Sequence, residues 1–251
     1  MSSSKSQAPK NKVSNHNKQN NKHHQMKQFL VALAAIFSVA APAQSDKYAD
    51  AMKQSLALFD SAKTAADFEN VSASFQRIGD AEKTQWLPYY WAAMSLATEG
   101  WRYFPDNNGA VAVKTDNLSG AMEALATRIN ALADQADAAT TANEDKAEIL
   151  IIRNMAATQQ MLVDPQSRWM TFGQQAGTYL QQASQLNPNN PRVYYLQGMS
   201  LFGTPEQFGG GKAAAKPLFE KAVAMGKAEQ QKPLHPHWSL EQSEQMLAQC
   251  Q

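Results

Sequence analysis

The sequence predicts an all-α fold of repeated helix pairs, and three observations support it. Small and large apolar residues recur at steps of four and three in two successive segments, namely Ala176, Leu180 and Ala183, then Ala215, Phe219 and Ala222. Apolar residues also follow helical spacing through most of the chain after residue 46. No stretch alternates apolar and polar positions with β-branched side chains for more than a few residues, as a half-buried strand would.

The steps of four and three have a physical reason in close helix packing. Small side chains let neighbouring helix axes approach, while Leu180 and Phe219 fill the space between them. Pro188 closes the first segment, and Tyr194 and Gly198 lead into the second in the same register. This pattern resembles the tetratricopeptide repeat (TPR), a helix–turn–helix unit of about 34 residues. The resemblance implies a right-handed TPR-like α-solenoid of antiparallel helix pairs with a C-terminal capping helix. It also implies a concave groove that binds protein segments.

One departure from the repeat predicts an enlarged turn. Seventeen positions separate Gly198 from Ala215, against about twelve in the family pattern, and the surplus lies in residues 203–211. A narrower resemblance is to a group of small exported repeat proteins of Bacteroidetes. It rests on the segments 77–90, 190–196, 205–212 and 235–238. This narrower resemblance implies a cellular address and a fold, but no activity.

The first 43 residues predict an export signal behind a polar leader. Residues 1–25 are rich in Ser, Asn, Gln, Lys and His, which is the composition of a disordered leader or upstream extension. Residues 26–43 have a basic start, an apolar run of about a dozen residues and a small-x-small site, as in a signal peptide cleaved before Gln44. The run is too short for a stable membrane anchor, and no cysteine stands at the cleavage site to take a lipid. We therefore expect an exported protein, periplasmic or secreted.

The net charge of the chain changes sign close to the end of the predicted signal peptide, at Asp46. Before Asp46 there are six lysines and no acidic residue, whereas the remainder carries all 22 acidic residues and 17 of the 23 basic ones, a net charge of −5. A net negative domain without a basic patch argues against a nucleic-acid partner. Cys250 is the single cysteine and cannot form an intramolecular disulfide, so helix packing must stabilise the fold.

The part after the signal peptide divides into a TPR-like helical repeat domain at 44–230 and a linker with the capping helix at 231–251. Asp46, Thr64 and Ser239 are predicted N-caps, because their side chains can accept a hydrogen bond from the first turn of a helix. Helices are also predicted to begin at Trp86 and Pro191. The ranges predicted for the other helices are 46–62, 116–137, 144–162, 165–187 and 239–250.

The densest aromatic cluster lies at 86–91. Helical spacing puts Trp86 and Tyr90 on or beside the face that packs on the preceding helices, which favours a place in the core. The alternative is that some of these rings line a groove for a peptide or another apolar ligand. We therefore name Trp86, Tyr90, Arg192 and Tyr195 as candidate contacts of a ligand or partner.

Gly209, Gly210, Gly211 and Lys212 form a second candidate element. They are not a phosphate-binding P-loop, because that motif needs a glycine where Glu206 stands and a preceding strand. Glycines that open a helix can still leave backbone N–H groups free to hold a carboxylate or phosphate beside a lysine. The alternative is a flexible turn that closes the enlarged loop.

The sequence gives little support for catalysis or metal binding. After the signal peptide the histidines are His235 and His237, both in a proline-flanked linker, and no nucleophile or second ligand cluster accompanies them. We expect no catalytic residue, no metal and no cofactor, and hence no enzyme. The leading hypothesis is a scaffold that binds a protein or peptide partner in the cell envelope. The alternative is a periplasmic solute-binding accessory protein that holds a small anionic or apolar ligand.

Overall fold

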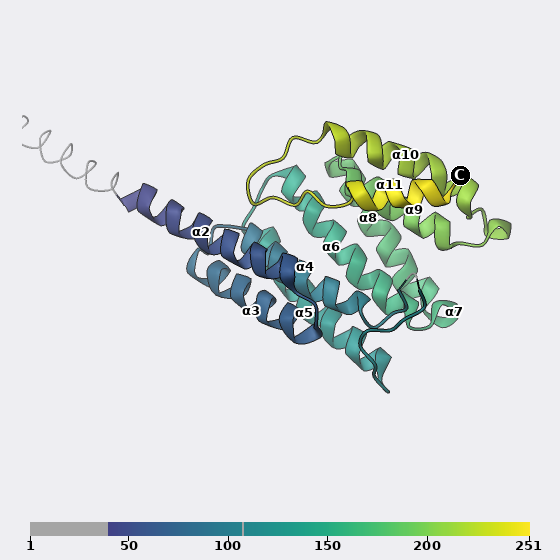
Figure 1. The fold of residues 1–251 in the computed structure, drawn as a ribbon, viewed down its shortest axis with the longest axis horizontal. Coiled ribbons are helices and arrows are strands. Elements are labelled where there is room, and N and C mark those ends of the chain that lie inside the picture. The colour runs from purple at the N-terminus through teal and green to yellow at the C-terminus, as the bar shows by residue number, and fades with distance from the viewer. Residues whose placement is uncertain (1–39, 107) are drawn as a thin grey trace, which may run out of the picture. The chain divides into compact units, whose positions relative to one another are not determined.

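The computed structural model describes residues 40–106 and 108–251, which form helices and loops without any strand (Figure 1). The elements are α2 (Ala40–Ser61), α3 (Ala65–Ala81), α4 (Leu87–Trp101), α5 (Leu118–Ala138), α6 (Asn143–Leu162), α7 (Pro165–Arg168), the π-helix η1 (Trp169–Gly173), α8 (Gln174–Leu186), α9 (Pro191–Gly203), the 3-10 helix η2 (Glu206–Phe208), α10 (Lys212–Ala228) and α11 (Leu240–Gln249). The all-α class is confirmed for this part of the chain. The predicted leader, and the predicted signal peptide up to residue 39, lie outside the described residues.

The turn between α2 and α3 shows how local sequence sets a helix boundary. The backbone N–H of Asp67 donates to the Thr64 hydroxyl at 3.1 Å, and the Asp67 carboxylate accepts from the Thr64 N–H at 2.8 Å. This reciprocal capping box satisfies two donors that the helix itself cannot, and it confirms the predicted cap at Thr64. The predicted cap at Asp46 is wrong, because α2 already includes that residue.

Helix α4 is the centre of the fold. Almost all of its residues are buried, and it packs against α3, α5 and α6. Two close approaches set this packing. A Cβ on Gly79 would stand 2.6 Å from the Tyr89 ring, and one on Gly100 would stand 2.3 Å from the Gln159 side chain. Gln159 is itself buried and donates to the Ala97 carbonyl at 2.7 Å, which ties the end of α6 to the end of α4.

Helices α5 to α8 follow the predicted ranges with one difference. The Asn117 side chain accepts from the Gly120 N–H at 2.9 Å and starts α5. The single helix predicted for 165–187 is instead α7, η1 and α8, because five residues at Trp169–Gly173 adopt π-helical geometry. A π-segment inserts extra backbone into a helix and rotates the side chains around it.

Helices α9, α10 and α11 form the C-terminal part. Gly198 lies under the Phe219 ring, so close that a Cβ would stand 2.6 Å from it, while Ala215 and Ala222 are fully buried. The small-and-large spacing thus packs α9 against α10 as the sequence predicts. Helix α11 packs on α10, and residues 48–251 form one compact unit. The right-handed TPR-like solenoid and the boundary at residue 230 stay predictions.

Candidate functional site

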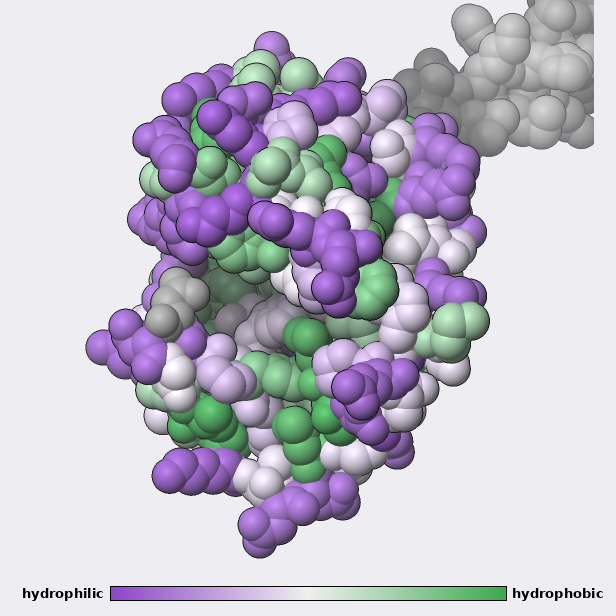
Figure 2. Space-filling model, turned by 90° about the vertical axis from the view of Figure 1, so that its right-hand side faces the viewer, coloured by the Kyte–Doolittle hydropathy of each residue, from purple (hydrophilic) through white to green (hydrophobic). Residues whose placement is uncertain are grey.

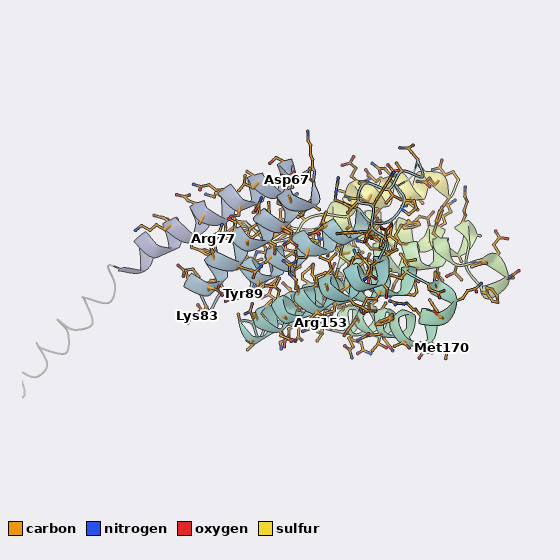
Figure 3. All side chains as sticks on the ribbon, turned by 90° about the horizontal axis from the view of Figure 1, so that it is seen from below. Asp67, Arg77, Lys83, Tyr89, Arg153 and Met170 are labelled. Carbon is orange, nitrogen blue, oxygen red and sulfur yellow. The ribbon has the colours of Figure 1, made fainter. Side chains whose placement is uncertain are left out.

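Four large apolar side chains on three elements are exposed to solvent. We call them together the apolar end: Trp169 and Met170 on η1, Met199 on α9 and Phe208 on η2. Their exposed fractions are 48%, 69%, 38% and 73%. Helix α7, the start of η1 and the η2 turn lie at the right-hand end of Figure 1. Figure 2 views that end and shows a hollow, with mostly polar groups above it and apolar groups inside and below it. Figure 3 shows Met170 at this end, away from Lys83 and Arg77.

The π-helix η1 is what presents Trp169. The Trp169 ring lies over Gly173, where a Cβ would stand 2.5 Å from it. The Arg168 guanidinium lies 5.7 Å from the centroid of the Phe172 ring and also donates to Ser119 at the start of α5 at 2.5 Å. The contact of Trp169 with Gly173 and the contacts of Arg168 with Phe172 and Ser119 hold this segment in place. Short π-segments are frequent at functional sites.

The glycine loop at 209–212 closes the turn between α9 and α10. The N–H groups of Gly209, Gly210 and Gly211 donate to backbone carbonyls of Glu206, Pro205 and Leu201, at 2.9, 3.3 and 2.8 Å. Gly209 and Gly211 have φ values of +83° and +90°, which glycine adopts without strain. These three donors are therefore engaged within the turn, and the predicted anion site at this loop stays a prediction. Lys212 stands exposed at the first turn of α10, four residues after Phe208.

A second region lies where the chain leaves α10 and turns back into α11, at the end of α10 opposite to the η2 turn (Figure 1). We call residues 229–239 the strap. Its backbone is held by side chains of other elements, because the Trp91 indole N–H donates to the Leu234 carbonyl at 2.8 Å. Its own indole N–H, on Trp238, donates to the Tyr90 hydroxyl at 3.1 Å. The His235 ring meets the Trp86 ring edge-on at 5.6 Å.

Four of the predicted site residues converge on this strap. Trp86 and Tyr90 are buried beneath it, and Tyr195 packs edge-on against Trp238 at 6.3 Å. Arg192 donates to the Trp238 carbonyl at 3.4 Å. The cluster is therefore part of the packed interior and also contacts an extended segment of the same chain. Whether any of the eight predicted residues binds an external ligand stays a prediction.

Arg192 holds the first residue of the strap, Glu229, through an ion pair, and we call the region around this pair and the strap the strap end. It is buried, and its guanidinium bonds Glu148 at 2.7 Å and Glu229 at 2.6 Å. Asn190 donates to the Glu148 carboxylate at 2.6 Å. Burial raises the pKa of Glu148, and the charge of Arg192 opposes that rise. A buried arginine between two carboxylates ties the start of α9 to α6 and to the first residue of the strap.

A polar cleft of about 430 Å³ opens beside this ion-pair network. It is lined by the start of α6, the turn between α8 and α9, the end of α10 and the strap. Glu144 at its rim pairs with Lys232 of the strap at 2.6 Å. Its lining is polar and charged, in contrast to the hollow at the apolar end.

A buried carboxyl group stands apart from both regions. Glu99, on the last turn of α4, is 4% exposed, and its Oε2 atom has no hydrogen-bond partner. Burial raises its pKa to about 7, and the charge of Glu69 adds to the rise while Arg128 opposes it. Arg128 is committed to Glu69, which it holds through two bonds of 2.5 and 2.6 Å. Glu99 is therefore a poorly compensated acid near neutral pH.

Sequence reasoning did not find the apolar end. Trp169, Met170 and Phe208 lie among polar residues, and the helix predicted for 165–187 gave no reason to place them outside. In the ranges that the structure describes, no group of three or more His, Cys, Asp or Glu side chains could hold a metal ion. Over the same ranges, no helix is long and apolar enough to cross a membrane.

Comparison with known proteins gives one informative similarity. No family model matches the chain, so the TPR resemblance stays a prediction, and no curated protein matches it. A solved structure that is similar is the HusA haemophore from Porphyromonas gingivalis, a binding protein from a genus of Bacteroidetes. Its TM-score is 0.67 and its sequence identity 31%, over 81% of this chain and 92% of the haemophore. At that identity and coverage, the chain belongs to the same protein family as the HusA haemophore.

Proposed function

We propose that this protein is an exported binding protein that captures a haem-type porphyrin at the apolar end. The similar structure is a haemophore, a protein that takes up haem. The observation that carries the proposal is the exposure of four large apolar side chains, Trp169, Met170, Met199 and Phe208, together with the hollow bordered by apolar groups at the end of the molecule that Figure 2 views. An apolar surface of this kind on a soluble protein marks a binding site more often than a free surface.

The chemistry of the apolar end suits a flat, apolar ring. An indole and a phenyl ring offer faces for stacking, and the thioethers of Met170 and Met199 adapt to irregular shapes. Burying one such side chain against a ligand stabilises the complex by roughly 1.5–3 kcal/mol. Lys212, exposed four residues after Phe208, supplies a positive charge that a porphyrin carboxylate can pair with.

The histidines among the described residues lie away from this surface. His235 and His237 both belong to the strap, which follows the end of α10, whereas η2 precedes the start of that helix. The proposal therefore places the binding energy in contacts with the porphyrin ring. Metal-free protoporphyrin should then bind within about tenfold of the affinity for haemin, because a tenfold difference is only 1.4 kcal/mol.

The direct test is a spectroscopic titration of the purified protein with haemin and with metal-free protoporphyrin. Trp169→Ala and Met170→Ala should each weaken binding by about tenfold or more, given the area they would bury. Leu58→Ala, which removes an exposed leucine on α2, is the matched control and should leave the affinity unchanged. Equal affinities for all four proteins would contradict the proposed site, and no binding at all would contradict the proposed function.

Export and the partner class are parts of the same proposal. Cell fractionation should find the protein outside the cytoplasm, with its N-terminus at residue 44 if the predicted signal peptide is cleaved. The leading sequence-based hypothesis was a TPR-like scaffold with a protein partner, and capture from an envelope extract separates the two. Recovery of a specific protein with no porphyrin bound would favour the scaffold.

A further inference from the structure

We infer that Met170 and Met199 are modification sites, and that their oxidation to methionine sulfoxide by hydrogen peroxide reversibly lowers the affinity of the apolar end for its ligand. The inference rests on the proposed function, because it assigns a form of regulation to the same side chains. It adds a chemistry that porphyrin binding does not involve, the two-electron oxidation of a thioether. The formation of the sulfoxide can be measured without any ligand.

Exposure separates these two methionines from the others in the part of the chain that the structure describes. The side chains of Met170 and Met199 are 69% and 38% exposed. The remaining methionines of the described residues are buried or half-buried, namely Met52, Met94, Met122, Met155, Met161, Met225 and Met246. A peroxide reacts only with a sulfur atom that it can reach. Oxidation should therefore begin at the two methionines of the apolar end.

Met170 also has a neighbour that suits its oxidised form. The side-chain amide of Gln174, the first residue of α8, donates to the Met170 sulfur at 3.7 Å. A thioether sulfur is a weak hydrogen-bond acceptor. The sulfoxide oxygen is polar and accepts more strongly, and the same amide can donate to it. The structure thus holds a donor in place for the product of the oxidation.

The oxidation of Met170 is a transfer of one oxygen atom and two electrons. A lone pair of the sulfur attacks one oxygen of the peroxide, so that a sulfur–oxygen bond forms and the oxygen–oxygen bond breaks. The second peroxide oxygen leaves as water with both protons. Sulfur is oxidised and the peroxide is reduced. A dithiol-dependent sulfoxide reductase reverses the change, because two thiols become a disulfide and the sulfoxide oxygen leaves as water.

The product changes the apolar end where a ligand would cover it. A thioether adapts to an apolar ligand, whereas a sulfoxide binds water that must be removed when the ligand covers it. Met170 directly follows Trp169 in η1, so the new polar group adjoins the exposed indole. We expect the affinity for a porphyrin to fall at least tenfold when Met170 and Met199 are both oxidised.

The first measurement is mass spectrometry of the purified full chain during treatment with hydrogen peroxide. Sulfoxide should form first at Met170 and next at Met199. It should form at least tenfold more slowly at the buried Met94 and Met122. Equal rates at Met170 and at these buried methionines would overturn the inference.

The second measurement is a titration with metal-free protoporphyrin before and after peroxide treatment, so that no iron reacts with residual peroxide. The wild type should lose at least tenfold in affinity, and a sulfoxide reductase should restore it. Met246→Leu is the matched control and should lose as much, because Met246 lies on α11 and its sulfur also accepts from a glutamine amide, that of Gln249 at 3.6 Å. The double variant Met170→Leu/Met199→Leu, compared only with itself, should have the same affinity before and after treatment.

The outcomes separate this inference from the proposed function. Wild-type affinity that survives full oxidation of Met170 and Met199 would overturn the inference, and so would an equal loss of affinity in the double leucine variant. Absence of protoporphyrin binding before any oxidation would contradict the proposed function instead. The order of sulfoxide formation would then still test the assignment of the two modification sites.

Discussion

The apolar end and the strap end use similar side chains in opposite ways. At the strap end, Trp91 and Trp238 have both indole nitrogens bonded and their rings covered by neighbouring aromatic groups. At the apolar end, the Trp169 side chain is 48% exposed and that of Phe208 is 73% exposed. The first arrangement is a completed interface and the second is an open one. Exposure, rather than residue type, therefore locates the surface that is free for an external ligand.

Two buried glutamates, Glu148 beside the strap and Glu99 at the end of α4, differ in how many hydrogen bonds their carboxyl groups receive. Glu148, at the strap end, receives hydrogen bonds from Arg192 and Asn190. Glu99, where α4 ends, has a buried oxygen without any partner. The strap end thus pairs its charges and holds an element in place, whereas the end of α4 leaves one carboxyl uncompensated. Variants that remove these charges should have opposite effects on stability.

Arg192→Met should have the largest effect on stability. It leaves Glu148 buried without its cation, and breaking a buried ion pair from one side costs about 3–5 kcal/mol. Urea unfolding at pH 7 measures this loss. The double variant Glu148→Gln/Arg192→Met should recover part of it, because no unpaired charge remains. A loss below about 1 kcal/mol would show that the strap end does not depend on the ion-pair network.

Glu99→Gln should stabilise the protein at high pH. The pKa of Glu99 is raised from 4.5 to about 7, so the folded state holds a proton between these values that the unfolded state has lost. The contribution of Glu99 to wild-type stability should therefore fall as the pH rises from 4.5 to 7 and stay low above it, by at most about 3 kcal/mol.

The measurement is urea unfolding of wild type and variant at pH 5 and pH 8. The variant should gain up to about 3 kcal/mol over the wild type at pH 8 and much less at pH 5. Glu220→Gln, which changes an exposed glutamate on α10, should give no such difference. A variant that is less stable than the wild type at pH 8 would mean that the Glu99 carboxylate has a partner in solution.

Gly198→Ala tests the helix packing that separates the two ends. Its Cβ would stand 2.6 Å from the Phe219 ring, and overpacking of this kind typically costs 1–3 kcal/mol. Gly177→Ala is the matched control, because nothing lies within 4 Å of its added Cβ on α8. The control should gain about 0.5–1 kcal/mol from helix propensity. Thermal unfolding of both variants measures the contrast, and equal shifts would contradict close packing at Gly198.

Local sequence signals predicted most of the helices. Thr64 forms the predicted cap, and Asn117 caps the helix that was predicted to begin at residue 116. The spacing around Gly198 and Phe219 predicted the contact between α9 and α10. Asp46 did not become a cap because α2 runs through it. Ser239 is the N-cap residue of α11, as predicted, and its N–H donates to the Gln242 side chain at 3.0 Å.

The two surfaces were less accessible to sequence reasoning. Tyr90, Arg192 and Tyr195 were named as contacts, yet the segment that they contact is about 45 to 150 residues away along the chain, and no periodicity reports such a pairing. The π-helix at Trp169–Gly173 was missed because apolar spacing in that segment fits a continuous α-helix. Trp169 and Met170, which are exposed, lie within this π-helical segment.

Amide hydrogen exchange with and without saturating haemin tests the central claim most directly. The account predicts slower exchange in η1, the end of α9 and the η2 turn, with the strap and the first turns of α4 unchanged. Metal-free protoporphyrin should give the same pattern. Protection confined to the strap and α4, with the apolar end unchanged, would contradict the claim that the exposed aromatic and methionine side chains hold the ligand.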